Sequence, residues 1–369
     1  MPVPAAIPAL NDSLKTWLFD HALPLWWEVG ADHRNGGFHD RIDLAGNAVD
    51  GPRRARVAAR QAWVYATAGK LGWTGPWQAA VKHAIDSLLG PFAREDGLFR
   101  ILVAADGSPL EERADPYEQA FALLALSAAQ QALGGDYEAR AIRTREALVA
   151  RVVEADGGVH DDETRGPPLR ANPMMHLFEA VQAWTAVGAD PGWQALADAI
   201  ADTALTRMID PASGALVELY DNDWTALPQA DVEPGHQFEW GWLLLQHARA
   251  AGRPDPAAAL RLIEIGETRG VENGIAIFSL DQDLRPRDRS ARLWAQTERL
   301  HAHAATGDWA GVLKAATGLN RYLDVPTPGT WLDRLQPDGT VVEEAAPGSS
   351  LYHIISASAA LDAACAAAR

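Results

Sequence analysis

The sequence predicts an all-α protein, an (α/α)6 barrel in which six helix pairs close into a ring with short β-hairpins at one mouth. Three observations lead to this prediction. A short, turn-rich segment recurs six times along the 369 residues. Each copy is followed, at a nearly constant interval, by a segment with helical periodicity. A second helical segment then completes the unit, so every unit supplies one helix pair.

The recurring short segments combine Gly, alternating apolar residues and Asp or Gly turns. Period-two alternation that ends in turn residues predicts a short strand or a hairpin. The six copies begin at Gly36, Asp96, Gly157, Ser213, Asn273 and Gly329.

One helix of each pair is rich in apolar and aromatic residues on several faces, which predicts an inner helix packed on both sides. These helices are expected to start near residues 56, 116, 172, 234, 292 and 349, at intervals of 60, 56, 62, 58 and 57 residues. Glycines that close several of the helices are predicted C′ residues, namely Gly72, Gly188, Gly252 and Gly307.

The partner helix has a cleaner polar face, as an outer helix should, for example at Trp193–Met208 and from Asp255 onward. The first helix of the chain, capped by Asn11 or Asp12, is expected to supply the partner that would otherwise be missing. Six units suit a closed ring better than an open solenoid, and no Gly/Ser-rich linker interrupts them. We therefore expect one domain that spans residues 1–369.

The overall charge narrows the class of ligand. Asp and Glu outnumber Lys and Arg by 49 to 32, which gives a formal net charge of −17. Nucleic-acid binding needs a basic surface, so we expect no nucleic-acid partner. A neutral small molecule fits this charge better than a polyanion, although a local pocket can override the mean field. No Lys-rich or Arg-rich loop indicates a phosphate or sulfonate site.

Targeting signals and cysteines point to a cytoplasmic protein. Cys365 is the single cysteine, so no disulfide can form within the chain. The first residues lack the basic and apolar regions of a signal peptide, and no run approaches the roughly 20 apolar residues that cross a membrane. Most of the 14 tryptophans are expected in the core, and some could cover the C–H face of a sugar ring.

The repeat also predicts where a binding site lies. Every hairpin enters its inner helix at the N-terminal end, so the first turns of all six inner helices surround one mouth of the barrel. Polar and aromatic residues gather in these turns: Arg60, Gln61, Asp115, Tyr117, Glu118, Asn172, His176, His236, Glu239, Arg292, Trp294, Glu298, Tyr352 and His353.

Three histidines stand out, because His176, His236 and His353 lie in the first two turns of the third, fourth and sixth inner helices. A neutral imidazole accepts a proton near pH 7, and its conjugate acid returns the proton. Such a pair suits removal of a hydrogen alpha to a sugar carbonyl, with donors that stabilise the enediolate oxygens. The sequence has no HExxH motif and no His/Cys cluster, so we expect neither a metal nor a cofactor.

At these residues the sequence resembles a known family. NPMMHLFEA, EPGHQFEWGWLLL, RLWAQTE and PGSSLYHI are similar to signature segments of the N-acylglucosamine 2-epimerase superfamily. ARQAWVYATA and DPYEQAFALLA are similar to its first two inner helices, so the resemblance spans about Arg56 to His353. It implies an (α/α)6 barrel and an enediol route between an aldose and a ketose, or between C2 epimers.

The resemblance also implies roles for individual residues. His236 and His353 match the acid/base pair that flanks C1 and C2 of the substrate, and His176 matches a histidine linked to sugar binding or ring opening. The positions that hold hydroxyls or the sugar ring match Arg60, Tyr117, Asn172, Glu239 and Trp294. Met174 stands where many relatives have a histidine, which leaves the specificity of the pocket open.

We expect an aldose–ketose isomerase that acts on a free monosaccharide, with D-mannose and D-fructose as the first candidate pair. A sugar 2-epimerase of the mannose/glucose, N-acylglucosamine or cellobiose type is the alternative, because it would use the same residues. A glycoside hydrolase on the same barrel would need a pair of carboxylic acids across the pocket and is disfavoured by the histidines. We expect a monomer or a homodimer.

Overall fold

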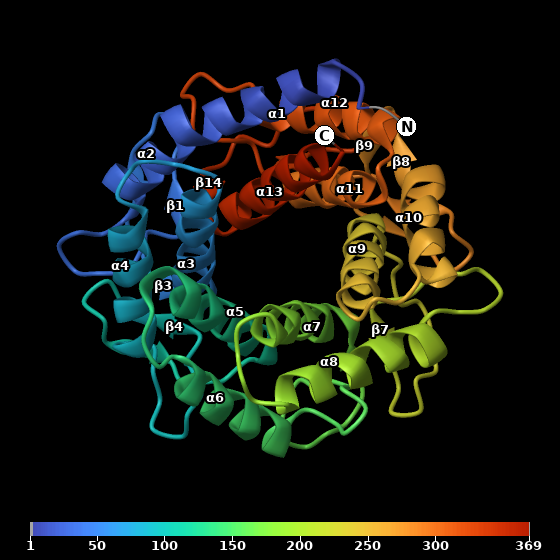
Figure 1. Ribbon diagram of the computed structural model, residues 1–369, viewed down its shortest axis with the longest axis horizontal. Helices are drawn as coiled ribbons and strands as arrows, with labels where there is room; N and C mark the ends of the chain where they lie inside the picture. The colour runs from blue at the N-terminus through green and yellow to red at the C-terminus, as the bar shows by residue number, and fades with distance from the viewer. Residues whose placement is uncertain (1–2, 369) are drawn as a thin grey trace.

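The inner layer of the protein is a closed ring of helices. A computed structural model describes residues 3–368, in which the inner helices are α3 (Ala55–Lys70), α5 (Pro116–Leu133), α7 (Ala171–Thr185), α9 (Pro234–Ala250), α11 (Leu293–Thr306) and α13 (Leu351–Ala367). Each inner helix contacts the next, and α13 contacts α3, which closes the ring (Figure 1). The predicted (α/α)6 barrel is confirmed.

An outer layer of helices surrounds this ring (Figure 1). Its members are α1 (Ala6–Trp17), α4 (Trp77–Leu89), α6 (Glu138–Arg151), α8 (Gly192–Thr203), α10 (Ala257–Gly270) and α12 (Trp309–Leu323). The π-helical segments η1 (Leu18–Ala22) and η2 (Trp26–Gly30), with α2 (Leu23–Leu25) between them, continue α1, and η3 (Ala204–Met208) continues α8. Helix α1 packs on α13 and α12. The beginning and the end of the described chain therefore lie side by side in the ring.

Short strands join the units at one mouth of the ring. They are β1 (Arg41–Ile42), β2 (Ala48–Val49), β3 (Arg53–Arg54), β4 (Leu102–Val103), β5 (Pro109–Glu111), β6 (Leu169–Arg170), β7 (Leu219–Tyr220), β8 (Val271–Glu272), β9 (Ile275–Ala276), β10 (Ser279–Leu280), β11 (Pro286–Asp288), β12 (Ala291–Arg292), β13 (Arg334–Leu335) and β14 (Ala346–Pro347). The strand before one inner helix pairs antiparallel with a strand before the next: β3 with β4, β6 with β7, β12 with β13 and β14 with β1. The strands and their turns form a belt of hairpins around this mouth, here called the hairpin belt. The pairing of β14 with β1 joins its last strand to its first.

Glutamines near the helix N-termini fix the hairpins to the ring. Gln119, Gln237 and Gln296 each stand fourth in their inner helix, and each side-chain amide bonds to both the N–H and the C=O of one hairpin residue. These partners are Phe99, Leu216 and Ala276, at 2.8 to 3.1 Å. Because both backbone groups of a buried residue are satisfied, the amide holds hairpin and helix in one register.

Two sequence predictions about helix ends are wrong. Helix α1 begins at Ala6, so neither Asn11 nor Asp12 caps it, and Asn11 is instead buried and donates to Asp362 at 2.8 Å. Gly72, Gly252 and Gly307 do take the positive φ of a C′ residue, whereas Gly188 does not. Asp115 caps α5 as predicted, accepting from the N–H of Tyr117 at 3.0 Å.

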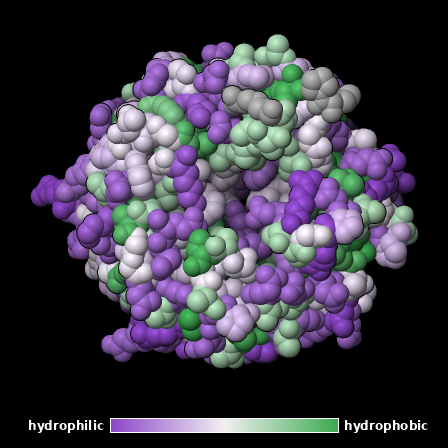
Figure 2. All heavy atoms as spheres, in the orientation of Figure 1, coloured by the Kyte–Doolittle hydropathy of each residue, from purple (hydrophilic) through white to green (hydrophobic). Residues whose placement is uncertain are grey.

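The core between the two layers contains most of the tryptophans, in line with the prediction. Trp184 and Trp193 stack with ring centroids 5.1 Å apart, and Trp26 stacks on Trp331 at the same distance. The face drawn in Figure 2 is hollowed at the centre of the ring, with hydrophilic residues around most of the hollow. Among residues 3–368, no helix is long and apolar enough to span a bilayer.

Candidate active site

A cavity of about 660 Å³ lies where the inner helices begin. It is lined by Arg56, Arg60, Ile101, Arg113, Asp115, Tyr117, Glu118, Asp161, Arg170, Asn172, Pro173, His176, Glu233, His236, Glu239, Phe278, Arg292, Trp294, Ser349, Ser350 and His353. The eight residues that were expected to have a catalytic or sugar-binding role all line it, namely Arg60, Tyr117, Asn172, His176, His236, Glu239, Trp294 and His353. Of the other first-turn residues, Gln61, Glu298 and Tyr352 do not line it. The helical repeat therefore predicted correctly which chain segments meet.

The repeat sets one ring of six floor residues, and four of them, Arg60, His176, Glu239 and His353, line the cavity. Counted from the first helical residue of each unit, with the 3-10 turn η4 (Gly348–Ser350) included in the last, the sixth residues are Arg60, Phe121, His176, Glu239, Glu298 and His353. Several neighbours in this ring touch: the Arg60 guanidinium lies 4.0 Å from the Phe121 ring centroid, and that ring lies 4.5 Å from the His176 ring. His236 stands third in α9 and lies outside this ring.

His236 is held by two carboxylates. Its Nδ1 lies 2.8 Å from Glu218 Oε1 and 3.6 Å from Glu233 Oε2. Burial opposes charge on the imidazole, but the negative charges of Glu218 and Glu233 outweigh burial and raise the pKa of His236 to about 10. His236 therefore carries a proton at neutral pH.

The pKa of His353 is shifted in the opposite direction from that of His236. Burial lowers its pKa, although a hydrogen bond between its Nδ1 and Glu298 Oε1, 2.7 Å long, acts against this shift. Glu298 also accepts from Trp242 Nε1 at 2.8 Å, and the bonds from His353 and Trp242 keep the pKa of this buried carboxyl below its usual range despite desolvation. His353 is neutral at pH 7, with its Nδ1 engaged and its Nε2 left to face a ligand.

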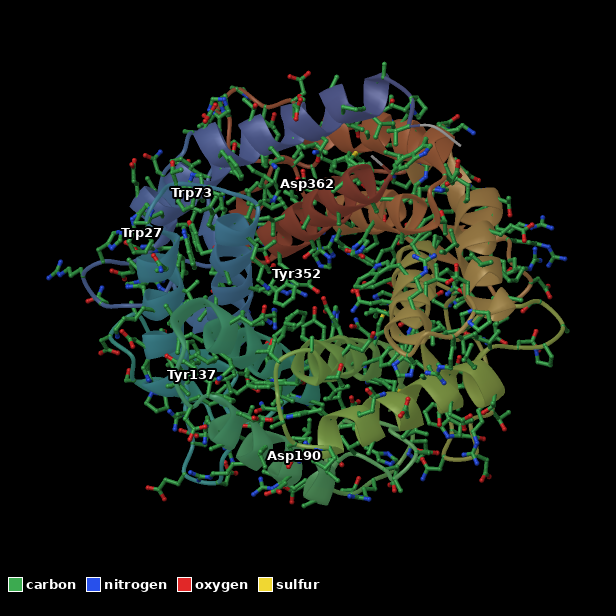
Figure 3. The ribbon with its side chains drawn as sticks, viewed as in Figure 1. Trp27, Trp73, Tyr137, Asp190, Tyr352 and Asp362 are labelled. Atoms are coloured by element: carbon green, nitrogen blue, oxygen red, sulfur yellow. The ribbon has the colours of Figure 1, made fainter. Side chains whose placement is uncertain are left out.

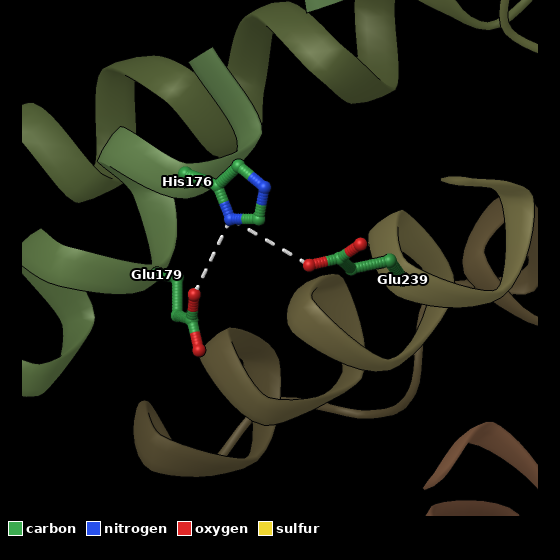
Figure 4. Close-up of side chains that lie close together, drawn as sticks. All are labelled: His176, Glu179 and Glu239. Carbon is green, nitrogen blue, oxygen red and sulfur yellow. Dashed lines mark ion pairs between the residues drawn. The ribbon is translucent and has the colours of Figure 1, made fainter. Parts of the chain in front are cut away.

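His176 lies between two further carboxyls, as Figure 4 shows. Its Nδ1 is 3.5 Å from Glu179 Oε2 and 3.6 Å from Glu239 Oε1. Burial raises the pKa of Glu179 to about 8, and burial with the nearby Glu298 charge raises the pKa of Glu239 well above its usual range. These shifts favour the protonated form of both carboxyls. Neither oxygen of Glu239 has a hydrogen-bond partner among residues 3–368, so this carboxyl is available to a ligand.

Tyr352 crosses the interior to complete this network. It lies on α13 toward the open centre of the ring (Figure 3), and its hydroxyl hydrogen-bonds to Glu179 on α7. The contact ties two opposite inner helices together beneath the cavity.

The predicted sugar-binding residues form the walls. Arg60 donates to the Tyr117 hydroxyl at 2.7 Å and to the Ser349 carbonyl at 3.2 Å, while its Nε has no partner among the described residues. The Trp294 ring lies 4.9 Å from His236 and 6.0 Å from His353, between the two imidazoles. Asn172 lines the cavity with an unpartnered Oδ1.

Met174 is a buried core residue of α7. It stands fourth in α7, where α5, α9 and α11 have their clamping glutamines, and it is fully buried. It is absent from the residues that line the cavity. The Met174 side chain therefore belongs to the core behind the site and not to the cavity wall.

Three groups of described side chains could offer ligands to a metal ion: His176, Glu179 and Glu239; Glu218, Glu233 and His236; and Glu239, Glu298 and His353. A tetrahedral zinc ion with bonds near 2.1 Å sets its ligands roughly 3.4 Å apart. The 2.8 and 2.7 Å contacts of His236 and His353 are hydrogen bonds and too short for this geometry. Only the spacing around His176 fits, so the absence of a metal stays a prediction.

The residues that sequence reasoning missed are carboxylates. Glu218, Glu233 and Glu179 were not identified, although they set the charge of His236 and the environment of His176. The spacing from His236 to Glu233 and from His176 to Glu179 is three residues, which places each pair on one helix face and could have indicated two of them. His39 and His160, which lie in the hairpin segments, do not line the cavity.

Comparison with known proteins identifies the family of the chain. The sequence model of the N-acylglucosamine 2-epimerase (GlcNAc 2-epimerase) family matches residues 36–357. The chain is 40% identical over 365 residues to a protein of Rhizobium meliloti (strain 1021) named mannose-6-phosphate isomerase, covering 93% of this chain and 94% of that one.

Two further relatives share the fold. A D-mannose isomerase of Thermobifida fusca is 28% identical over 339 residues, covering 80% of this chain and 79% of its own. A crystal structure of a D-mannose isomerase superposes with a TM-score of 0.88 at 20% identity, covering 98% of this chain and 99% of that one.

Proposed function

The chain belongs to the N-acylglucosamine 2-epimerase family, and within it we propose an aldose–ketose isomerase that interconverts D-mannose and D-fructose through an enediol. Family membership makes the protein an enzyme of the isomerase and epimerase kind. The single observation that carries the choice of chemistry is the contrast in the surroundings of the two histidines. Glu218 and Glu233 raise the pKa of His236, whereas burial lowers the pKa of His353. Two titratable groups whose environments push their pKa values apart suit an acid and a base.

The first half-reaction moves two protons. Neutral His353 takes the proton from C2 of the open-chain aldose, and the C–H electron pair becomes the C1–C2 double bond. The C1 carbonyl electrons pass to O1, which takes a proton from charged His236. The product is a neutral enediol, with His353 now charged and His236 neutral.

The second half-reaction restores both histidines. Neutral His236 takes the proton from O2, O2 forms the ketose carbonyl, and the double-bond electrons take the proton of His353 at C1. His353 thus acts on carbon in both halves and His236 acts on oxygen. No group beyond this chain's own residues enters the scheme, in keeping with the proposal that no cofactor is needed.

The remaining cavity residues bind and orient the sugar in this proposal. Arg60 and protonated Glu239 donate to oxygens whose negative charge grows in the transition state. Tyr117, Asn172 and neutral His176 hold hydroxyls, and Trp294 covers the sugar face between the two imidazoles. The whole ring acts as one domain, because the floor residues come from all its units.

A 2-epimerase is the second candidate, favoured by the presence of imidazoles on both sides of Trp294. Epimerisation would require His236 to protonate C2 on the face opposite His353. In the isomerase scheme, His353 alone exchanges protons with carbon. The two reactions therefore differ in the carbon that receives the proton and in the histidine that delivers it.

The test follows sugars by NMR in D2O without added metal. With D-mannose we expect fructose to form with deuterium at C1, whereas glucose without fructose would establish the epimerase. His353→Ala should abolish exchange at C2, and His236→Ala should do the same or nearly so. His21→Ala, at an exposed histidine outside the cavity, is the matched control. Absence of C2 exchange across a panel of aldoses would refute the proposal.

A further inference from the structure

We propose that the rim of this cavity on the side of α5 and α7 is a subsite for an anionic group at C6 of the sugar, phosphate foremost, built around Arg113 and Arg170. The inference rests on the proposed function, because the reacting end of the sugar is placed by His236 and His353. It revises the expectation of a neutral substrate drawn from the net charge.

Arginine is concentrated around this cavity despite the acidic composition. Five guanidinium groups line it, from Arg56, Arg60, Arg113, Arg170 and Arg292. They come from four separate repeat units, each within a few residues of the start of an inner helix. Five carboxyl groups also line the cavity, from Asp115, Glu118, Asp161, Glu233 and Glu239. Arginines and carboxyl groups are therefore equal in number here, unlike in the whole chain with its net charge of −17. The five arginines come from different units of the repeat, so no local sequence pattern marks them as one set.

The position of the histidines decides which arginines meet the far end of the sugar. His236 on α9 and His353 on α13 flank α11, and helices α9, α11 and α13 form one half of the inner ring. A sugar with C1 and C2 between these histidines extends its C6 end toward the other half, formed by α3, α5 and α7. Arg113 lies just before α5, and Arg170 is the N-cap residue of α7.

The side chains of Arg113 and Arg170 are exposed, so their guanidinium nitrogens can bind a ligand. The Arg170 side chain is 46% exposed and forms a salt bridge with Asp161, in which Nε lies 2.6 Å from Oδ1. The Arg113 side chain is 60% exposed and meets Glu111 through Nε and Asp115 through Nη1, both at 3.2 Å. Exposed pairs of this kind contribute little to stability. A phosphate dianion can therefore compete with or join these carboxylates.

The other arginines are less available. Arg56 donates hydrogen bonds to the buried Glu118 from both its guanidinium and its backbone N–H. Arg292 bonds to the buried Asp333 at 2.8 Å and lies on the side of the reacting carbons. The N-termini of α5 and α7 add a favourable dipole for an anion beside Arg113 and Arg170.

The experiment compares kcat/KM for D-mannose, D-mannose 6-phosphate and D-mannuronate in the wild type and in Arg113→Gln, Arg170→Gln and the double variant. We expect the wild type to prefer the 6-phosphate at least about tenfold, and each single variant to lower kcat/KM for the 6-phosphate about tenfold, with D-mannose changed less than about twofold. Mannuronate separates a carboxylate subsite from a phosphate subsite. Arg207→Gln is the matched control, because Arg207 is 54% exposed, pairs with Asp156 at 3.0 Å and lies outside the cavity.

Binding of the unreactive mannitol 6-phosphate, measured by calorimetry, tests the subsite without turnover. If no aldose reacts but mannitol 6-phosphate binds more weakly to the double variant, the proposed function fails and the subsite stands. Equal kcat/KM for free and phosphorylated mannose would overturn the subsite. So would a phosphate preference that survives in the double variant.

Discussion

Replacing Glu218 by glutamine tests the idea that His236 works as a charged acid. Glu218 is the nearest carboxylate to the imidazole, 2.8 Å from Nδ1, whereas Glu233 is 3.6 Å away. Glutamine keeps the size of the side chain and an acceptor oxygen but removes its charge. An opposite charge at such a distance shifts a pKa by about 1 to 3 units, or about 1.4 to 4 kcal/mol.

The sign of the effect follows from the raised pKa. His236 with a pKa of about 10 stays charged through neutral pH and loses its proton as the pH rises past that value. In wild type we expect the rate to fall at the alkaline end, near pH 10. In Glu218→Gln the alkaline limb should move down by about 1 to 3 pH units. The raised pKa also stabilises the fold most below pH 6.5, and this contribution is lost between pH 6.5 and 10.

The assay is kcat for mannose isomerisation from pH 5 to pH 11, together with a ¹⁵N NMR titration of His236. Glu233→Gln should move the alkaline limb less than Glu218→Gln, because its carboxylate is farther from the imidazole. Glu264→Gln, which breaks an exposed pair with Arg261 on α10, controls for general charge effects. An alkaline limb that stays in place in Glu218→Gln would refute the assignment of His236 as the acid.

Three further predictions concern the same protein. Glu298→Gln should lower kcat about 10²-fold or more, because the base His353 loses the carboxylate that orients it; C2 exchange in D2O measures this, and wild-type exchange would contradict it. Protein treated with EDTA and then dialysed should keep its activity within about twofold, whereas loss of activity that zinc restores would show that the His176 group holds a metal. Glu267→Gln should destabilise the fold by about 3 to 5 kcal/mol in urea unfolding, because the fully buried Arg299 loses both of its charged contacts, at 2.6 and 2.7 Å; a change below about 1 kcal/mol would show that the pair is dispensable.

The repeat made most of the architecture predictable. The inner helices begin within about two residues of the expected positions, because each start carries a local signal such as Pro116 or Pro234 after a turn-rich segment. The convergence of the six N-termini follows from ring closure, so the cavity lining was accessible from sequence. The prediction for α1 failed because Asn11 resembles a cap locally, while a tertiary bond to Asp362 uses its side chain.

The charges around the catalytic histidines were harder to predict from the sequence. Glu218 lies on the hairpin 18 residues before His236, and nothing local indicates that the two side chains meet. The five arginines of the cavity lining are spread over four units, and only the closed ring brings them to one cavity. Which imidazole is charged depends on these long-range contacts, so the sequence identified the histidines but left their protonation open.

The joining of β14 to β1 has a consequence for how the enzyme is made. Five of the six floor residues belong to helices α3 to α11, but His353 lies on α13, which leaves the ribosome after all of them. Until α13 is synthesised, α3 and α11 lack a neighbour and the hairpin belt lacks its last pairing. Contacts between such distant segments form late and slowly. In the proposed scheme, the nascent chain therefore gains its base and its closed core in the same event.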